Sequence, residues 1–179
     1  MGDERGIERR LYRVIFAYVA ILMAFNPILP SLRRAYDALW PGTFATALWT
    51  AAAVWTGALL VWLWGQGRLR DARSWGWVAL LMGAVGGVAT TFQDPIEFIH
   101  LPEYGALAIL WCRVLGSGPG GLLRAGLAAA AVGILDEAFQ AVLPQRVYDT
   151  RDVVYNAVGA LLGVVAYGTV WNSRASRKM

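Results

Sequence analysis

The chain has 179 residues, of which 58% are hydrophobic and only 16% are charged. A water-soluble domain does not normally carry this balance, so the composition favours an integral membrane protein. The net charge of +4 would suit a nucleic-acid binder, but the arginines lie between hydrophobic runs, as signals of membrane topology do, and we expect no nucleic-acid partner. Cys112 is the only cysteine, so no internal disulfide can form.

Six hydrophobic runs follow one another along the chain. They cover residues 11–30, 43–64, 75–92, 95–113, 121–143 and 152–171. Each has roughly the 20 residues that a helix needs to cross the hydrocarbon core of a bilayer. The first run follows arginines, as a signal peptide would, but no small-residue cleavage site follows it. We therefore predict an all-α integral membrane protein, a helical bundle of about six transmembrane helices.

Two features predict helix boundaries. Proline removes a backbone donor, so we expect the first span to bend or end at Asn26-Pro27. Asp94 is the predicted N-cap of the fourth span, with Pro95 at its first helical position. Glu97 then falls where a capping box places its carboxylate, so capping alone would also explain this residue.

Lys and Arg are distributed unevenly between the two predicted sides of the membrane. The N-terminus, the second and fourth loops and the C-terminal tail carry twelve of them, and the other loops carry four. The positive-inside rule therefore places both termini in the cytoplasm of a multi-pass protein. Six tryptophans fall near the same surface, as an aromatic belt would: Trp62, Trp64, Trp75, Trp77, Trp111 and Trp171.

Residues 136–163 concentrate polar side chains between apolar flanks, where they cost free energy unless they are paired or used. Within this stretch Asp136 and Gln140 are four residues apart and share a helix face. A longer stripe with steps of three and four contains Asp149, Asp152, Asn156, Gly159 and Gly163. The two glycines form GxxxG, which we interpret as close helix packing.

A second polar face precedes this stretch, because Glu97, His100 and Tyr104 are spaced three and four apart. The predicted topology brings both polar faces to the non-cytoplasmic side, where we expect one site. Glu103 lies deeper in the same helix, where a carboxylate must face other helices or water or else be neutral.

We predict that His100, Asp136 and Glu137 carry acid–base chemistry or ligate a metal, and that Arg146 holds an anion. The surrounding ligand-binding residues are predicted to be Asp149, Asp152, Asn156, Gln140, Glu97 and Tyr104. Oxygen ligands with one imidazole could hold a divalent cation, although no metal or cofactor is specified by the sequence. A structural interpretation stays open, in which Arg146 pairs with Asp149 or Asp152 and Asp152 caps the last span.

The run ExxHxxxY from Glu97 to Tyr104, followed by DExxQxxxPxRxxDxxDxxxNxxGxxxG from Asp136 to Gly163, resembles the VanZ-like family. That family often has Asp-Lys where this chain has Ile96-Glu97. The resemblance covers roughly residues 75–171. It implies a small multi-pass protein of the bacterial inner membrane that acts at the cell envelope. The family is named for a member associated with resistance to the glycopeptide teicoplanin.

On this basis we divide the chain into three parts. Residues 1–74 form an N-terminal tail with the first two transmembrane helices, 75–171 the VanZ-like four-helix region, and 172–179 a basic cytoplasmic tail. Our leading hypothesis is an extracytoplasmic site that binds or modifies an anionic envelope component, a lipid-linked glycan or a phospholipid head group. The alternative is a non-catalytic accessory subunit that packs against other membrane subunits, in one version with His100 ligating a tetrapyrrole. Whether the chain is an enzyme stays open.

Overall fold

The computed structural model describes residues 2–25, 27–144 and 148–171, and every regular element within them is a helix. The long helices are α1 (Gly2–Phe25), α2 (Leu29–Leu39), α3 (Phe44–Gly65), α4 (Ala72–Ala89), α5 (His100–Leu115), α6 (Pro119–Gln140) and α7 (Thr150–Ala166). A 3-10 helix, η1 (Pro95–Ile99), leads into α5, and a π-helix, η2 (Tyr167–Trp171), continues α7. The predicted all-α fold is confirmed for this part of the chain.

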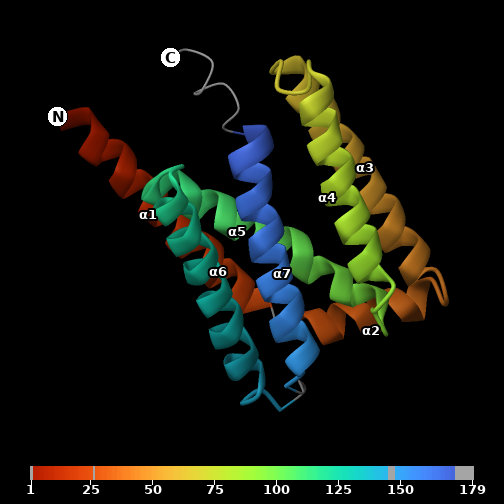
Figure 1. Ribbon diagram of the computed structural model, residues 1–179. Coiled ribbons are helices and arrows are strands. Elements are labelled where there is room, and N and C mark those ends of the chain that lie inside the picture. The colour runs from red at the N-terminus through yellow and green to blue at the C-terminus, as the bar shows by residue number, and fades with distance from the viewer. Residues whose placement is uncertain (1, 26, 145–147, 172–179) are drawn as a thin grey trace.

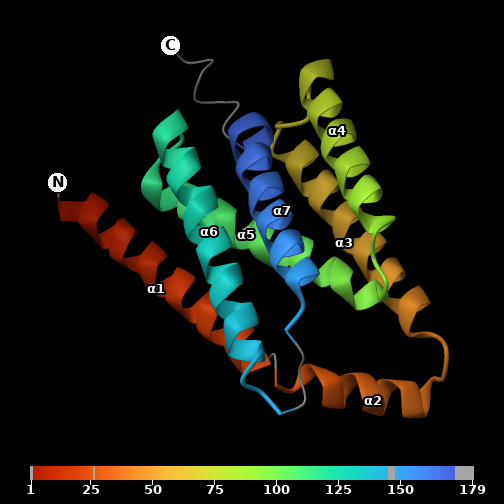
Figure 2. The same ribbon diagram turned by 60° about the horizontal axis from the view of Figure 1, so that its bottom comes forward.

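Six of the helices alternate in direction, while the short α2 lies across one end of the bundle (Figures 1 and 2). α1 begins and α7 ends at the end of the bundle opposite to α2 (Figure 1). The end of α6 and the starts of α5 and α7 therefore meet at the end that α2 covers. This is the end at which the sequence placed the polar residues.

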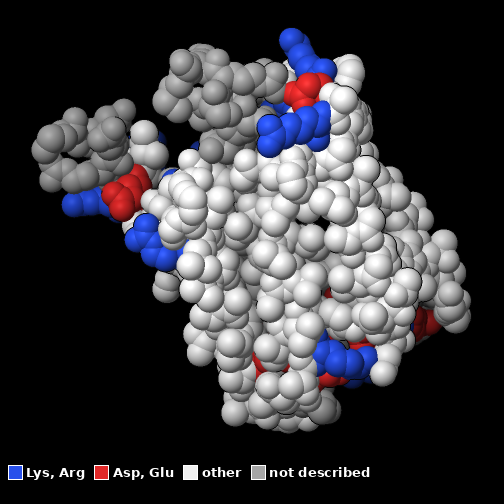
Figure 3. Space-filling view, viewed as in Figure 1, with Lys and Arg blue, Asp and Glu red and all other residues white. Residues whose placement is uncertain are grey.

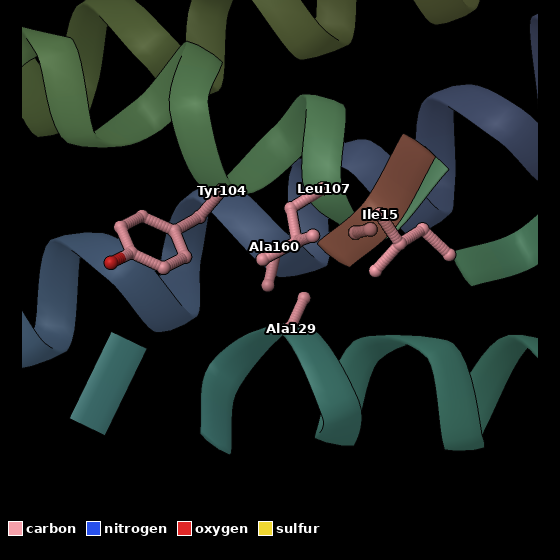
Figure 4. Packing of buried hydrophobic residues seen from close by; sticks show 6 residues of the cluster. Ile15, Tyr104, Leu107, Ala129 and Ala160 are labelled. Carbon is pink, nitrogen blue, oxygen red and sulfur yellow. The ribbon is translucent and has the colours of Figure 1, made fainter. Parts of the chain in front are cut away.

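The core lies where α5, α6 and α7 pack against one another, with α1 against α5. Its buried members are Ile15, Tyr104, Leu107, Ala108, Ala129 and Ala160. Figure 4 shows the small side chains of Ala129 and Ala160 facing the larger Leu107 across this core. Because each of the three packed helices contributes an alanine, Ala108, Ala129 or Ala160, they can approach closely.

The closest approach in this core is between α5 and α7 and depends on glycine. A Cβ atom built on Gly159 would lie 2.8 Å from the backbone oxygens of both His100 and Leu101. One built on Gly163 would collide with the backbone oxygen of Gly105. The GxxxG pair on α7 thus lets two backbones touch, in agreement with the packing role predicted for it.

Three helical segments of the described residues are long and apolar enough to cross a membrane: Phe44–Gly65, Pro95–Leu115 and Thr150–Val170. Together α1 and α2 would make a fourth span, bent by 57°. The predicted membrane protein is thus supported, with three or four of the six predicted spans meeting this test. α4 and α6 are not among them, and Arg124, Asp136 and Glu137 add charge to α6.

The surface of the bundle also fits a bilayer. α3 buries only Leu63, while Trp55 and Val61 are 76% and 74% exposed. A helix that is apolar all round yet exposed is suited to lipid rather than water. Figure 3 shows the charged side chains of the visible face at its two ends, with a broad uncharged band between them.

α2 was not predicted from the sequence, and it occupies much of the expected loop between the first two spans. α1 ends at Phe25, as predicted for the Asn26-Pro27 break, although Asn26 itself lies outside the described residues. Within α2, Arg33 pairs with Asp37 at 2.8 Å and reaches Asp94 at 3.3 Å. These contacts attach α2 to the turn before η1.

The predicted cap of the fourth span is also present, with two differences. Asp94 accepts a hydrogen bond from the backbone of Ile96 at 2.9 Å, as an N-cap does. The first turn, however, is the 3-10 helix η1 rather than α-helix. The Glu97 carboxylate accepts from the backbone of Gln93 at 2.9 Å instead of that of Asp94. The cap is therefore one residue longer than a standard capping box.

Candidate functional site

Seven polar or charged residues are buried in the described part of the chain, and six of them are predicted site residues. The six are Glu97, His100, Asp136, Glu137, Gln140 and Asn156. They come from η1, the start of α5, the end of α6 and the first half of α7. Buried polar groups are costly unless they are paired, so their concentration at one end of the bundle requires either an internal network or a ligand.

Part of this requirement is met by an internal network. The Tyr104 hydroxyl donates to Asp136 Oδ2 at 2.8 Å. Gln140 Nε2 donates to the same oxygen at 3.3 Å and to Glu137 Oε1 at 2.9 Å. One amide thereby supplies hydrogen bonds to two buried carboxylates. Asn156 Nδ2 extends the network by donating to the backbone oxygen of Gly133 at 3.3 Å.

His100 and Asp152 form the pair most suited to chemistry. The distance from His100 Nε2 to Asp152 Oδ2 is 3.5 Å, and their side chains are 9% and 17% exposed. A carboxylate in this position fixes the orientation and tautomer of an imidazole. Glu103 and Glu137 also interact electrostatically with His100. The imidazole therefore lies among three carboxylates.

A cavity of about 70 Å³ lies beside the His100–Asp152 pair. Its polar lining residues are Glu97, His100, Glu103 and Asp152. Its apolar lining residues are Leu22, Phe25, Leu29, Ile96 and Ile99. The apolar residues come from the junction of α1 with α2 and from η1. A cavity lined by both polar and apolar residues suits the boundary between the head and the chain of an amphiphile.

Arg151 joins the outer edge of the site to the start of α7. Its Nη2 lies 2.7 Å from Asp149 Oδ2 and 3.2 Å from Glu97 Oε1. Asp149 is also the N-cap of α7, because its Oδ1 accepts from the backbone of Arg151 at 2.8 Å. Asp152 therefore does not cap this helix, contrary to the structural interpretation. The Arg151 guanidinium lowers the pKa of the Asp149 carboxyl below its usual value.

Several buried atoms of the site have no hydrogen-bond partner among the described residues. They are His100 Nδ1, Glu137 Oε2, Arg151 Nη1, Asp152 Oδ1 and Asn156 Oδ1. Three of the five are oxygens of carboxylates or an amide, which accept hydrogen bonds. The unpaired groups therefore favour a ligand that brings hydrogen-bond donors, such as hydroxyl groups, together with one acceptor for the arginine.

No group of three or more His, Cys, Asp or Glu side chains in the part of the chain described by the structure is placed to hold a metal ion. Two of the residues that we considered as ligands of a divalent cation each have one atom engaged in a pair. His100 is paired with Asp152, and Glu137 with Gln140.

The structure thus brings together nine of the ten predicted site residues. Arg146 is the tenth; it lies outside the described residues, so its role stays a prediction. Two residues were left out of the predicted set, Arg151 and Glu103. Arg151 could have been included because it stands between Asp149 and Asp152 in the polar stretch. Glu103 could have been included because a carboxylate at membrane depth needs a partner.

The VanZ/LLP1 family pattern matches residues 11–171 of the 179-residue chain. The chain belongs to the VanZ/LLP1 family. The match starts at residue 11, so it includes the N-terminal hydrophobic segments that the motif resemblance did not cover. Neither the curated proteins nor the solved structures contain a match to this VanZ/LLP1 protein. Family membership supports a membrane protein, and the role of its polar site has to be argued from the geometry.

Proposed function

We propose that this VanZ/LLP1 protein spans the bacterial inner membrane six times, with both termini in the cytoplasm and the polar site on the extracytoplasmic side. The uneven distribution of Lys and Arg supports this topology. So does the alternation of six long helices, with the start of α1 and the end of α7 at the same end of the bundle (Figure 1).

We further propose that the site binds an anionic envelope component, a lipid-linked glycan or a phospholipid head group. The observation that carries this proposal is the cavity that the His100–Asp152 pair lines together with apolar residues of α1, α2 and η1. A lipid-linked molecule has a polar part and a hydrocarbon part, which match the polar and the apolar lining residues of the cavity. Its hydrocarbon part would contact Phe25 and Leu29, and its polar part would reach His100.

The charges of the site restrict the ligand further. Glu97, Glu103 and Asp152 line the cavity, so a polyanion would be repelled. A single phosphate could bind Arg151, but it would compete there with Asp149 and Glu97. The unpaired acceptor oxygens match hydroxyl groups of a sugar or of glycerol. A head group with one phosphate and several hydroxyls therefore fits best.

If the bound molecule is also modified, His100 is the residue suited to transfer a proton. In this scheme Asp152 is a positioning residue that holds the imidazole with its other nitrogen, Nδ1, available to the ligand. The Tyr104–Asp136–Gln140–Glu137 network lies behind the pair and keeps the end of α6 in place. The same geometry supports binding without reaction.

The proposal can be tested by native mass spectrometry of the protein purified gently from its own membranes. We expect the wild type to retain a lipid-linked molecule of defined mass, and His100→Gln and Asp152→Asn to lose most of it. Glu8→Gln is the matched control, since Glu8 is an exposed side chain on α1, far from the site along the sequence. Equal retention by all four proteins would refute the assignment of the site.

The same experiment addresses the alternative role as an accessory subunit. The exposed Trp55 and Val61 of α3 could contact another membrane protein as readily as lipid. Purification in a fixed ratio with unrelated subunits, unchanged in a folded Asp136→Asn variant, would favour that role. Loss of ligand in Asp136→Asn with no such subunits would favour the binding site.

A further inference from the structure

A second and larger hollow lies between α1 and α5, away from the polar site. Its volume is about 490 Å³. It is lined by Tyr12, Arg13, Ile15, Phe16, Val19 and Trp111. His100 stands at the start of α5 and Trp111 in its last turns, so the hollow belongs to the other half of the bundle. We call it the α1–α5 groove.

Polarity changes along this groove in one direction. Arg9, Tyr12, Arg13 and Phe16 share one face of α1, because they are three or four residues apart. The arginines come first, and the apolar Phe16 and Val19 follow toward the middle of the helix. Phe16 is 78% exposed, which suits a side chain in contact with hydrocarbon. The groove therefore has a basic end and an apolar run.

The polar groups at the basic end are mainly hydrogen-bond donors. The Trp111 indole Nε1 is buried without a hydrogen-bond partner among the described residues. Arg13 has only donor groups, and its side chain is exposed at the mouth of the groove. Tyr12 packs edge-on against Trp111, with ring centroids 6.1 Å apart. A ligand bound here should thus carry an acceptor, and a negative charge would be favoured by the arginines.

The shape of the lining argues against a partner helix as the occupant. Helices that pack closely in membranes do so through small residues, as Gly105 and Gly163 show within this bundle. The groove is lined instead by aromatic, branched and basic side chains. A flexible hydrocarbon chain can fill an uneven surface of this kind, whereas a rigid helix cannot.

We propose that the α1–α5 groove binds one anionic phospholipid. Its acyl chain lies along Phe16 and Val19, and its phosphate accepts hydrogen bonds from Arg13 and the Trp111 indole. Basic residues near a membrane surface attract anionic lipids, so Arg9 adds to the binding without touching the acyl chain. This site is separate from the His100 cavity and does not depend on the function proposed for it.

The test is native mass spectrometry of the delipidated full chain in micelles, titrated with phosphatidylglycerol or with phosphatidylcholine. The wild type should retain one phosphatidylglycerol more tightly than phosphatidylcholine. Arg13→Gln should weaken the binding of phosphatidylglycerol about five-fold, the effect of one cation near the membrane surface. Val19→Trp should displace the acyl chain and weaken the binding of both lipids.

Arg73→Gln provides the matched control, because it removes the same charge at an exposed position of α4 outside the groove. Each variant is accepted as folded if Cys112, which is buried, stays protected from a thiol reagent. The proposal is overturned if Arg13→Gln binds phosphatidylglycerol as tightly as Arg73→Gln does. It is also overturned if folded Val19→Trp retains both lipids unchanged, or if a second copy of the chain occupies the groove in place of lipid.

Discussion

Gly159 offers the sharpest test of how packing positions the site. In Gly159→Ala the new Cβ atom would stand 2.8 Å from the backbone oxygens of His100 and Leu101. Ordinary contacts begin near 3.4 Å, so α5 and α7 would have to separate by several tenths of an ångström. Backbone oxygens cannot rotate away as side chains can. The clash can therefore be relieved only if α5 or α7 shifts as a whole.

The expected loss of stability follows from two opposing effects. Overpacking a well-filled core costs about 1–3 kcal/mol, and a clash with backbone belongs at the upper end. Replacing glycine by alanine within a helix returns about 1 kcal/mol. We therefore expect Gly159→Ala to lower the free energy of unfolding by about 2 kcal/mol. For a chain of this size, this corresponds to a fall in melting temperature of roughly 4–8 °C.

The assay uses the single cysteine. Cys112 is fully buried, so a thiol-reactive dye reports unfolding in micelles as the temperature rises. Gly57→Ala is the matched control, because a Cβ atom built on this glycine of α3 has nothing within 4 Å. The control should be as stable as the wild type or more so. If Gly159→Ala and Gly57→Ala have the same melting temperature, the backbones of α5 and α7 are not in contact at Gly159.

Three further predictions concern single side chains. Tyr104→Phe removes the hydrogen bond to Asp136 and should lower the free energy of unfolding by about 1.5–3 kcal/mol, measured by the same dye assay. Asp149→Asn keeps the helix cap but loses the charge that pairs with Arg151. This pairing lowers the pKa of Asp149 below its ordinary value of 3.8. The stability that the wild type gains from the pair should therefore be complete above pH 3.8 and be lost as the pH falls through the lowered pKa. Cys112 should react with maleimide only after unfolding, as a mass-shift assay on the intact protein would show.

Each of these three predictions has an outcome that would contradict it, and the first also has a control variant. Tyr36→Phe removes an exposed hydrogen bond to Thr43, so its effect should be close to zero. A Tyr104→Phe variant no less stable than Tyr36→Phe would mean that the buried network adds nothing. A constant difference between Asp149→Asn and the wild type from pH 3 to pH 7 would contradict the ion pair. Rapid labelling of Cys112 at room temperature would contradict the packing of α5.

The sequence predicted the helices well because apolar runs and their interruptions are local signals. It also predicted that Gly159 and Gly163 would lie in a close helix contact, since glycine at that spacing has few other uses in a membrane helix. It did not predict α2. A bend at Asn26-Pro27 is visible in the sequence, whereas the arrangement of Arg33 with Asp94 depends on a turn 61 residues away.

In the candidate site, too, the positions of residues along the helices could be predicted from the sequence, whereas contacts between helices could not. Glu97, His100, Asp136 and Asn156 could be expected at one end of the bundle from topology alone. Which residues would pair could not be read from spacing, because pairing depends on how α5 and α7 cross. His100 thus meets Asp152, and Arg151 turns back to Asp149 and Glu97.

The position of α2 has a consequence for access to the polar site. α2 contains no buried residue, yet its first residue, Leu29, forms part of the cavity wall. Its contacts with the rest of the bundle include Arg33, which pairs with Asp94 and stacks on the Phe44 ring at 3.7 Å, and Tyr36, which packs edge-on against the same ring. Segments with so few buried contacts open locally at low free energy. Backbone amides of α2 should exchange with deuterium sooner than those of α5. The part of the cavity lining that Leu29 supplies should then open more readily than the part that His100 and Glu103 supply.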